Sequence, residues 1–345
     1  MEQTRTAAGA AGGDHSGPFE GGVVSQPIDA VLTWVDGEDP AHVAKRSTYD
    51  PGFGAAGVEA TRFASRDEIR FSLMALLKFA PWLRRIHIVT DGQTPNVVQE
   101  LWASDPSLRE RVKIVDHTVI YRGHEALLPI FSGRTIETAL YRIPDLAERY
   151  IYLNDDFFLI RPVQPTDFFT DTGPILRGHW MTRAYGLVPM LQLAVGRLKR
   201  RGKNWQPVGF KLQQLRAARL VGWGLRFFSI GHTPHPLRRS TFQRFEAAHP
   251  GVIEANMAPR FRHGSQFNPA SLANHLELAA GTATVAASDN TVYFRADVDK
   301  PQRVREKTAE AEAREDALFI CVNSLDQASA EVQADILCFL RRRIL

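Results

Sequence analysis

The sequence predicts a doubly wound, Rossmann-like α/β fold, with a mostly parallel sheet between two layers of helices. Short apolar runs typical of buried strands alternate with segments of helical periodicity, and the connections between them have ordinary lengths. Several of the apolar runs end in an acidic residue. Because an open α/β sheet binds its ligand beyond the carboxyl ends of its strands, these endings predict a site at one edge of the sheet.

The individual elements follow from apolar spacing and from turn-forming residues at their ends. Strands are predicted at residues 28–35, 85–91, 112–117, 150–153 and 318–323. Helices are predicted from Ser65 to Pro81, at 96–102, 135–141, 187–198 and 210–228, and from Ser329 to the C-terminus. Residues 1–26 are rich in Gly and Ala and lack periodicity, which predicts a disordered tail. One catalytic domain is expected over residues 27–345.

The composition is that of a soluble globular protein, with 44% hydrophobic and 23% charged residues among 345. No apolar run reaches the roughly 18–20 residues of a transmembrane helix, and the N-terminus lacks the apolar core of a secretory signal. The two cysteines, Cys321 and Cys338, predict neither a disulfide framework nor a cysteine-rich zinc site. We therefore expect a cytoplasmic protein with reduced thiols.

Charge is distributed unevenly, although the net charge is only +4. No Asp or Glu occurs between Asp171 and Glu246, a stretch that contains many arginines and lysines. Within it, residues 174–228 are predicted to form a basic helical insertion. Such a block indicates an anionic partner, namely a phosphate-rich polymer, a membrane surface or nucleic acid. The alternative is a solvated, arginine-rich surface without a partner.

Adjacent carboxylates follow the predicted strand at residues 150–153. Asn154, Asp155 and Asp156 come directly after this apolar run, at the expected ligand edge of the sheet. Hard oxygen ligands at such a place suit Mg²⁺ or Mn²⁺, which neutralises nucleotide phosphates. The alternative is a solvated turn in which these side chains make local hydrogen bonds.

Histidines and arginines in the second half of the chain are further candidates. His232 and His235 lie in a proline-containing segment, and either suits a general base or a donor to phosphate near neutral pH. Arg260 and Arg262 present guanidinium groups that suit developing phosphate charge. Arg70, near a helix start, is either a diphosphate clamp or part of a solvated face. Each of these residues also has a structural interpretation, as a packed or exposed side chain.

Taken in order, these segments resemble the Stealth family, also described as hexose-1-phosphate or capsular polysaccharide phosphotransferases. Animal relatives are the catalytic subunits of the lysosomal-enzyme N-acetylglucosamine-1-phosphotransferase. The four motif regions of the family are similar to residues 28–37, 70–156, 232–263 and 319–323. The sequence departs from the family pattern at residues 130–133, at Tyr141 and at Ser324, so we assign no acid chemistry there.

The resemblance implies an enzyme that faces the cytoplasm and builds exopolysaccharide or capsule. It would take a nucleotide-activated sugar, with a UDP-sugar as the expected donor, and transfer sugar-1-phosphate to a hydroxyl of a glycan acceptor. A nucleoside monophosphate leaves, and the product is a phosphodiester. This chemistry depends on positioning and on charge neutralisation.

The residue types agree with that chemistry. Asp156, with Asp155 beside it, would hold Mg²⁺ or Mn²⁺. Arg262 and Arg70 would stabilise charge on the transferred phosphoryl group. His232 or His235 would accept the proton of the hydroxyl, and the sequence does not decide between them. The candidates for the nucleotide end are Asp29, Trp34, Asp36 and Gly37.

Two alternative functions remain. A metal-dependent glycosyltransferase of the GT-A-like kind would use a similar sheet, donor and acids but would release a nucleoside diphosphate. A non-enzymatic module could instead bind an anionic polymer through the basic insertion. Because clustered acids oppose binding to nucleic acid, we expect no nucleic-acid partner. The basic insertion also makes peripheral association with the inner face of the membrane an expectation.

Overall fold

The computed structural model describes residues 26–49, 67–182 and 209–345. Its central sheet has five strands in the order β3-β2-β1-β4-β9. The strands are β1 (Ile28–Thr33), β2 (Ile86–Thr90), β3 (Val112–Asp116), β4 (Arg149–Asn154) and β9 (His235–Arg238). The first four pair in parallel, and β9 runs antiparallel to β4. The predicted, mostly parallel α/β sheet is therefore confirmed.

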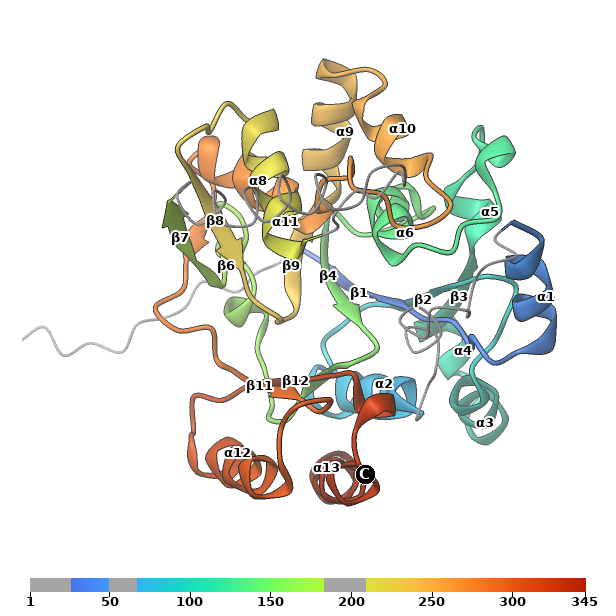
Figure 1. Ribbon diagram of the computed structural model, residues 1–345, viewed down its shortest axis with the longest axis vertical. Helices are drawn as coiled ribbons and strands as arrows, with labels where there is room; N and C mark the ends of the chain where they lie inside the picture. The colour runs from blue at the N-terminus through green and yellow to red at the C-terminus, as the bar shows by residue number, and fades with distance from the viewer. Residues whose placement is uncertain (1–25, 50–66, 183–208) are drawn as a thin grey trace, which may run out of the picture.

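Both faces of this sheet are buried, which explains the nearly continuous apolar runs of its strands. In β1, Ala30 and Leu32 pack into one hydrophobic core, whereas Val31 between them packs into a second core on the opposite face. Figure 1 shows α2 (Glu68–Phe79), α12 (Pro301–Ala313) and α13 (Ala330–Ile344) on one side of the sheet and α6 (Gly133–Ala139), α9 (Arg239–Ala248) and α11 (Pro269–Ala279) on the other. Helices thus cover both faces, as the sequence predicts.

The described residues contain helices throughout the chain. They are α1 (Pro40–Tyr49), α2 (Glu68–Phe79), α3 (Asn96–Ser104), α4 (Leu108–Arg111), α5 (His117–Ile120), α6 (Gly133–Ala139), α8 (Phe210–Leu220), α9 (Arg239–Ala248), α10 (Val252–Met257), α11 (Pro269–Ala279), α12 (Pro301–Ala313) and α13 (Ala330–Ile344). A 3₁₀ turn over Leu140–Arg142 continues α6. The last helix begins as predicted, because the Ser329 side chain accepts a hydrogen bond from the Val332 N–H.

A second sheet lies beside the first and positions the two adjacent acids. It contains β11 (Thr291–Arg295), β12 (Phe319–Asn323) and β5 (Phe157–Leu159), in that order. The chain passes from β4 in the first sheet to β5 in the second through Asp155 and Asp156. The backbone N–H of Val322 donates to the carbonyl of Asp156 at 3.0 Å. The acids therefore lie at the junction of two sheets, with their backbone held from both sides.

The basic segment differs from its prediction. Residues 210–228 were expected to form one helix, but α8 ends at Leu220 and Arg226–Ile230 forms β8, which pairs with β7 (Gly178–Thr182). Gly222 has φ of 84° and ends the helix, since few other residues adopt this conformation. Two short strands, β6 (Ile175–Leu176) and β10 (Thr284–Val285), form a further pair. The predicted helix at 187–198 and the tail at 1–25 lie outside the described residues.

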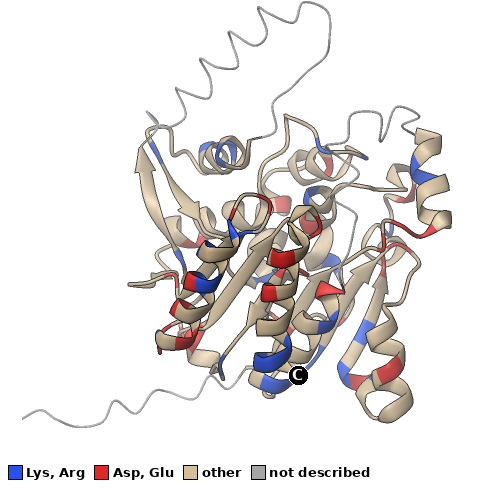
Figure 2. Ribbon diagram, turned by 60° about the horizontal axis from the view of Figure 1, so that its bottom comes forward, with Lys and Arg blue, Asp and Glu red and all other residues tan. Residues whose placement is uncertain are grey.

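The described part of this segment presents a basic and apolar surface, which we call the ribbon surface and define as Trp180, Leu220, Leu225 and Arg226. Leu225 is 79% exposed and Trp180 is 39% exposed. The Arg226 guanidinium lies 4.3 Å from the centre of a Trp180 ring. Helix α8 contains basic residues and no acid (Figure 2). Among the described helices, none combines the length and the apolar character needed to cross a membrane.

Candidate active site

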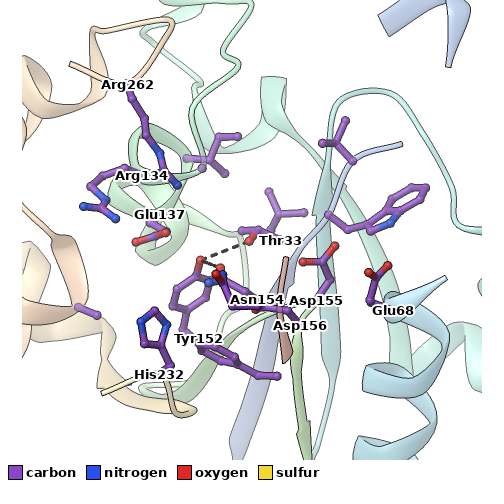
Figure 3. A pocket seen from close by; sticks show the side chains of 18 of the residues that line it. Thr33, Glu68, Arg134, Glu137, Tyr152, Asn154, Asp155, Asp156, His232 and Arg262 are labelled. Atoms are coloured by element: carbon purple, nitrogen blue, oxygen red, sulfur yellow. Dashed lines mark hydrogen bonds between the residues drawn. The ribbon is translucent and has the colours of Figure 1, made fainter. Parts of the chain in front are cut away.

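A cavity of about 470 Å³ opens at the carboxyl ends of β1 and β4. Its walls come from segments far apart in the sequence, including the ends of β1 and β4, the helices α2 and α6, and the loops that carry His232 and Arg262 (Figure 3). The polar side chains that matter most for the chemistry are Glu68, Arg134, Glu137, Tyr152, Asn154, Asp155, Asp156, His232, Arg262 and Asn323. This is the edge of the sheet at which the sequence predicts a site.

Three acids line one wall of the cavity. Asp155 and Asp156 follow β4, and Glu68 begins α2 (Figure 3). Burial raises the pKa of Asp156 to about 7, and the charge of Glu68 adds to the shift, although hydrogen bonds with Cys321 and Asn323 oppose it. Burial and the charge of Asp156 raise the pKa of Asp155 well above its usual range. Carboxylates held this way favour any cation that neutralises them.

The acid wall fits a divalent ion that is shared with a ligand. The Oδ2 atom of Asp156 accepts a weak hydrogen bond from the Cys321 thiol at 3.7 Å, whereas its Oδ1 atom is buried and has no hydrogen-bond partner in the described part of the chain. Among the described residues, no group of three His, Cys, Asp or Glu side chains could hold a metal ion alone. Mg²⁺ commonly uses one or two carboxylates and completes its shell with water and phosphate oxygens. Asp155 and Asp156 suit that mode of binding.

The facing wall carries two guanidinium groups. Arg134 and Glu137 come from α6, and Arg262 from the loop after α10; all three lie on the same side of the cavity in Figure 3. Burial raises the pKa of Glu137, and the charges of Arg134 and Arg262 and a hydrogen bond with Tyr152 oppose that shift. Guanidinium groups at this place suit the binding of a phosphate or other anion.

The two predicted histidines have different environments. His232 stacks between Phe210 and Tyr293, with ring centres 5.2 Å and 4.6 Å away, and its ring faces the cavity (Figure 3). Burial lowers its pKa. His235, on β9, is only 7% exposed and stacks on Tyr152. Burial, with a contribution from His232, lowers the pKa of His235 to about 3. Both imidazoles are therefore neutral near pH 7.

Asp29, a predicted nucleotide contact, lies at the other end of its strand. It is near the start of β1, about 13 Å along the strand from Thr33 at the cavity. The carboxylate is fully buried and accepts hydrogen bonds from Arg84 at 2.6 and 2.9 Å and from the Ala147 N–H at 2.8 Å. Burial alone would raise its pKa, but the bonds with Arg84 and His87 hold it at about 2. Asp29 is thus the buried member of an ion pair whose partner, Arg84, is partly exposed.

Three further predicted residues also do not line the cavity. Arg70, on α2, bonds both oxygens of Glu100 at 2.6 and 2.8 Å and pairs with Asp67. Asp36 accepts the Glu38 N–H at 2.9 Å in the turn after β1, and Gly37 belongs to the same turn. The structure therefore brings together one subset of the predicted residues: Trp34, Asp155, Asp156, His232, His235 and Arg262.

Four charged residues of the cavity were not predicted from the sequence: Glu68, Arg134, Glu137 and Asp326, the last in the 3₁₀ turn Leu325–Gln327. Glu68, Arg134 and Glu137 all lie on helices, whereas the search favoured strand ends and loops. One signal was present, because Arg134 and Glu137 are three residues apart and thus share one face of a short helix. Nothing in the local sequence indicates that this face meets the carboxyl end of β4.

Solved structures resemble the chain only loosely. The galactosyltransferase LgtC, in complex with donor and acceptor sugar analogues, is 11% identical, with a TM-score of 0.45 over 92% of this chain and 96% of that one. Mouse xyloside xylosyltransferase 1 is 13% identical, with a TM-score of 0.38 over 86% of this chain and 98% of that one.

Similarity to characterised sequences is much closer. Exopolysaccharide phosphotransferase SCO6023 of Streptomyces coelicolor is 36% identical over 86% of this chain, and SCO2594 of the same organism is 32% identical over 94%. The chain spans about half the length of these two relatives, 47% and 52%. Capsular polysaccharide phosphotransferase LcbA of Aeromonas hydrophila is 30% identical over 78% of this chain and 71% of its own length.

Family models give the same assignment. Residues 26–54 match conserved region 1 of the Stealth proteins, and residues 62–176 match conserved region 2. The second match contains Arg134, Glu137, Asp155 and Asp156, so that most of the polar wall residues described above lie within it. The suggested third and fourth motif regions stay a prediction. On these matches and on its similarity to LcbA, the chain belongs to the Stealth protein family.

Proposed function

We propose that the protein transfers sugar-1-phosphate from a nucleotide-activated sugar, with a UDP-sugar as the expected donor, to a hydroxyl of a glycan. The product is a phosphodiester in an exopolysaccharide or capsule chain. One observation carries the proposal: a single cavity holds the Asp155–Asp156 pair on one wall and the Arg134 and Arg262 guanidiniums on the facing wall. The names of the relatives, exopolysaccharide and capsular polysaccharide phosphotransferases, support it.

Two oppositely charged walls suit transfer of a phosphoryl group. The donor has two phosphates, and a divalent ion held by Asp155 and Asp156 would neutralise charge on its diphosphate. The guanidiniums of Arg134 and Arg262 would stabilise charge that develops on the transferred phosphoryl group, at ~3 kcal/mol for each well-placed donor. A glycosyl transfer leaves the diphosphate intact and requires no such facing wall. The arrangement therefore favours phosphotransfer over the glycosyltransferase alternative.

We assign His232 as the base that accepts the proton of the acceptor hydroxyl. The hydroxyl oxygen attacks the phosphorus that carries the sugar, the bond from that phosphorus to the bridging oxygen breaks, and a nucleoside monophosphate leaves. The neutral ring of His232 faces the cavity and can accept the hydroxyl proton. His235 is a weaker base, since its pKa is about 3, and its ring is packed behind Tyr152. We therefore assign His235 a supporting role, a choice that the sequence alone left open.

Glu137 orients the guanidinium wall in this proposal. Its carboxyl group lies beside Arg134 and Arg262, whose charges favour its ionised form. The acid wall continues to Trp34, whose indole lines the same cavity and is the remaining candidate contact for the nucleotide. The donor would then extend from Trp34 past the carboxylates, with its sugar phosphate against the guanidiniums. The glycan acceptor would approach from the side of His232.

We also propose that the protein attaches peripherally to an anionic lipid surface, through the ribbon surface. Trp side chains favour the membrane interface, and basic residues are attracted to anionic headgroups. Exposed Leu225 and Trp180 lie next to Arg226, in a segment without acids. Within the described residues, this interpretation replaces the second predicted helix, 210–228, with the shorter helix α8 and the strand β8.

The test is to incubate the protein with a panel of nucleotide sugars, a glycan acceptor, and Mg²⁺ or Mn²⁺, and to identify the released nucleotide. Phosphotransfer predicts a nucleoside monophosphate, dependent on the metal and on Asp156. Release of a nucleoside diphosphate would instead establish the glycosyltransferase alternative. An absence of turnover, with salt-dependent retention of an anionic polymer, would establish the binding module.

A further inference from the structure

A second cavity, of about 300 Å³, lies at the other end of the helix that supplies Arg134 and Glu137 to the active site. It is lined by Val119, Arg122, Tyr141, Arg142, Pro144, Arg239, Gln243 and Glu246. Helix α6 and its 3₁₀ continuation lead from Arg134 to Tyr141, about 11 Å along the axis at a helical rise. The cavity shares no lining residue with the first one.

Positive charge dominates this second cavity. Three arginines line it against a single acid, Glu246, which is 38% exposed and lies 3.9 Å from Arg142. Arg142 and Arg239 are fixed in place by backbone carbonyls, which carry no net charge: Arg142 donates to Ile120 at 2.8 Å, and Arg239 donates to Tyr141 at 3.2 Å. Held this way, the guanidiniums are oriented, and the single acid Glu246 can offset only one of the three positive charges. Such an arrangement favours a phosphate or carboxylate ligand.

A buried hydroxyl without a well-formed hydrogen bond gives a second, independent indication of a ligand. Tyr141 is 3% exposed, its ring stacks on Phe242 at 5.4 Å, and its hydroxyl has no well-formed hydrogen bond within the described residues, although Glu246 and Arg142 lie close enough to shift its pKa. Leaving a buried hydroxyl unsatisfied costs about 1–3 kcal/mol. Burial raises the pKa of this phenol, and a weak hydrogen bond with Glu246 and the charge of that residue add to the shift, so the group stays protonated and can donate. A ligand oxygen in the cavity would satisfy it.

We propose that this cavity binds a phosphodiester group of the growing glycan, away from the reacting phosphate. The ligand identity rests on the proposed function, because a phosphotransferase of this kind would make a polymer with one negative charge at each phosphodiester. The acceptor end would occupy the first cavity while an earlier phosphodiester lies among Arg122, Arg142 and Arg239. The free enzyme would thereby prefer acceptors that already carry a phosphodiester.

The test is calorimetric titration of the full chain with three probes: a phosphodiester-linked oligosaccharide, a neutral oligosaccharide of the same length, and inorganic phosphate. Arg122 is exposed, so Arg122→Gln should fold normally. It should weaken binding of the phosphodiester probe about fivefold to tenfold, as expected for one charge-assisted hydrogen bond. Tyr141→Phe keeps the stacked ring and should weaken the same binding about threefold. Arg341→Gln, an exposed change on α13, is the matched control and should bind as the wild type does.

The outcomes separate this inference from the proposed function. Weaker binding in both variants, without any turnover of nucleotide sugars, would refute phosphotransfer and leave the anionic-glycan site standing. Turnover with identical affinities in the wild type, Arg122→Gln and Tyr141→Phe would refute the second site alone. Inorganic phosphate that binds as tightly as the phosphodiester probe would assign the cavity to free phosphate and overturn the glycan ligand. Equal binding of the neutral oligosaccharide would also overturn it.

Discussion

The Asp156→Asn substitution tests whether the ionised Asp156 carboxylate destabilises the folded protein when no metal ion is bound. The pKa of Asp156 rises from its ordinary 3.8 to about 7, through burial and the charge of Glu68. About three pKa units correspond to ~4 kcal/mol of unfavourable free energy for the ionised form. Because Asp156 lines an open cavity that water enters, screening reduces this cost, and we expect about 1–2 kcal/mol. The Asp156→Asn protein should therefore be more stable than the wild type at pH 8 without metal.

The sign of the pH dependence follows from proton binding. Between about pH 4 and pH 7, folded Asp156 holds its proton while the unfolded chain has lost it, so wild-type stability falls as the pH rises through this window. Urea unfolding at pH 5 and pH 8 in EDTA measures the fall. The loss of stability between pH 5 and pH 8 should be smaller in Asp156→Asn than in the wild type. The control Asp171→Asn, at an exposed position outside the cavity, should lose as much stability as the wild type. Mn²⁺ should restore wild-type stability at pH 8 and have little effect on Asp156→Asn. Equal falls in all three proteins would refute the reasoning.

Five further substitutions test the roles of the two histidines, of Arg262, of Asp29 and of the ribbon surface. His232→Asn should lower turnover by about 10²–10⁴-fold in a steady-state assay, whereas His235→Phe, which keeps the stacked ring, should retain most of it; the reverse order would exchange their roles. Arg262→Gln should lower kcat by about 10²–10³-fold with a smaller change in KM, and a pure KM effect would remove Arg262 from the transition state. Asp29→Asn should cost about 3 kcal/mol in urea unfolding because it breaks the ion pair of a buried carboxylate, and the wild-type contribution should vanish as the pH falls from about 4 towards 2; unchanged stability would contradict this. Leu225→Glu should reduce co-sedimentation with phosphatidylserine vesicles, and unchanged binding would exclude the ribbon surface.

Local sequence predicted the sheet well because its strands are buried on both faces. Residues 28–33, 86–90, 112–116 and 149–154 form the parallel strands where apolar runs indicated them. The adjacent acids of the site could also be predicted from the local sequence, since Asp155 and Asp156 follow such an apolar run directly. The direction of each strand also excludes one of the candidates. Asp29 lies near the start of its strand and therefore at the opposite edge from the site.

Other features depend on tertiary packing, which the local sequence does not predict. The acids at the carboxyl ends of β2 and β3 have structural roles. Asp91 pairs with Lys45 at 2.9 Å, and Asp116 accepts the Gly92 N–H at 2.7 Å. The facing wall comes from a short helix whose polar side could equally have faced solvent. The break at Gly222 interrupts an apolar pattern that otherwise suits a continuous helix.

The most direct measurement follows the phosphorus next to the sugar. A nucleotide-sugar donor labelled in that phosphate is incubated with the protein, acceptor glycan and Mg²⁺ or Mn²⁺, and the glycan and nucleotide are then separated. The account predicts that the label enters the glycan, at the same rate as unlabelled nucleoside monophosphate appears. Label that stays in a released nucleoside diphosphate, while the sugar alone enters the glycan, would contradict phosphotransfer.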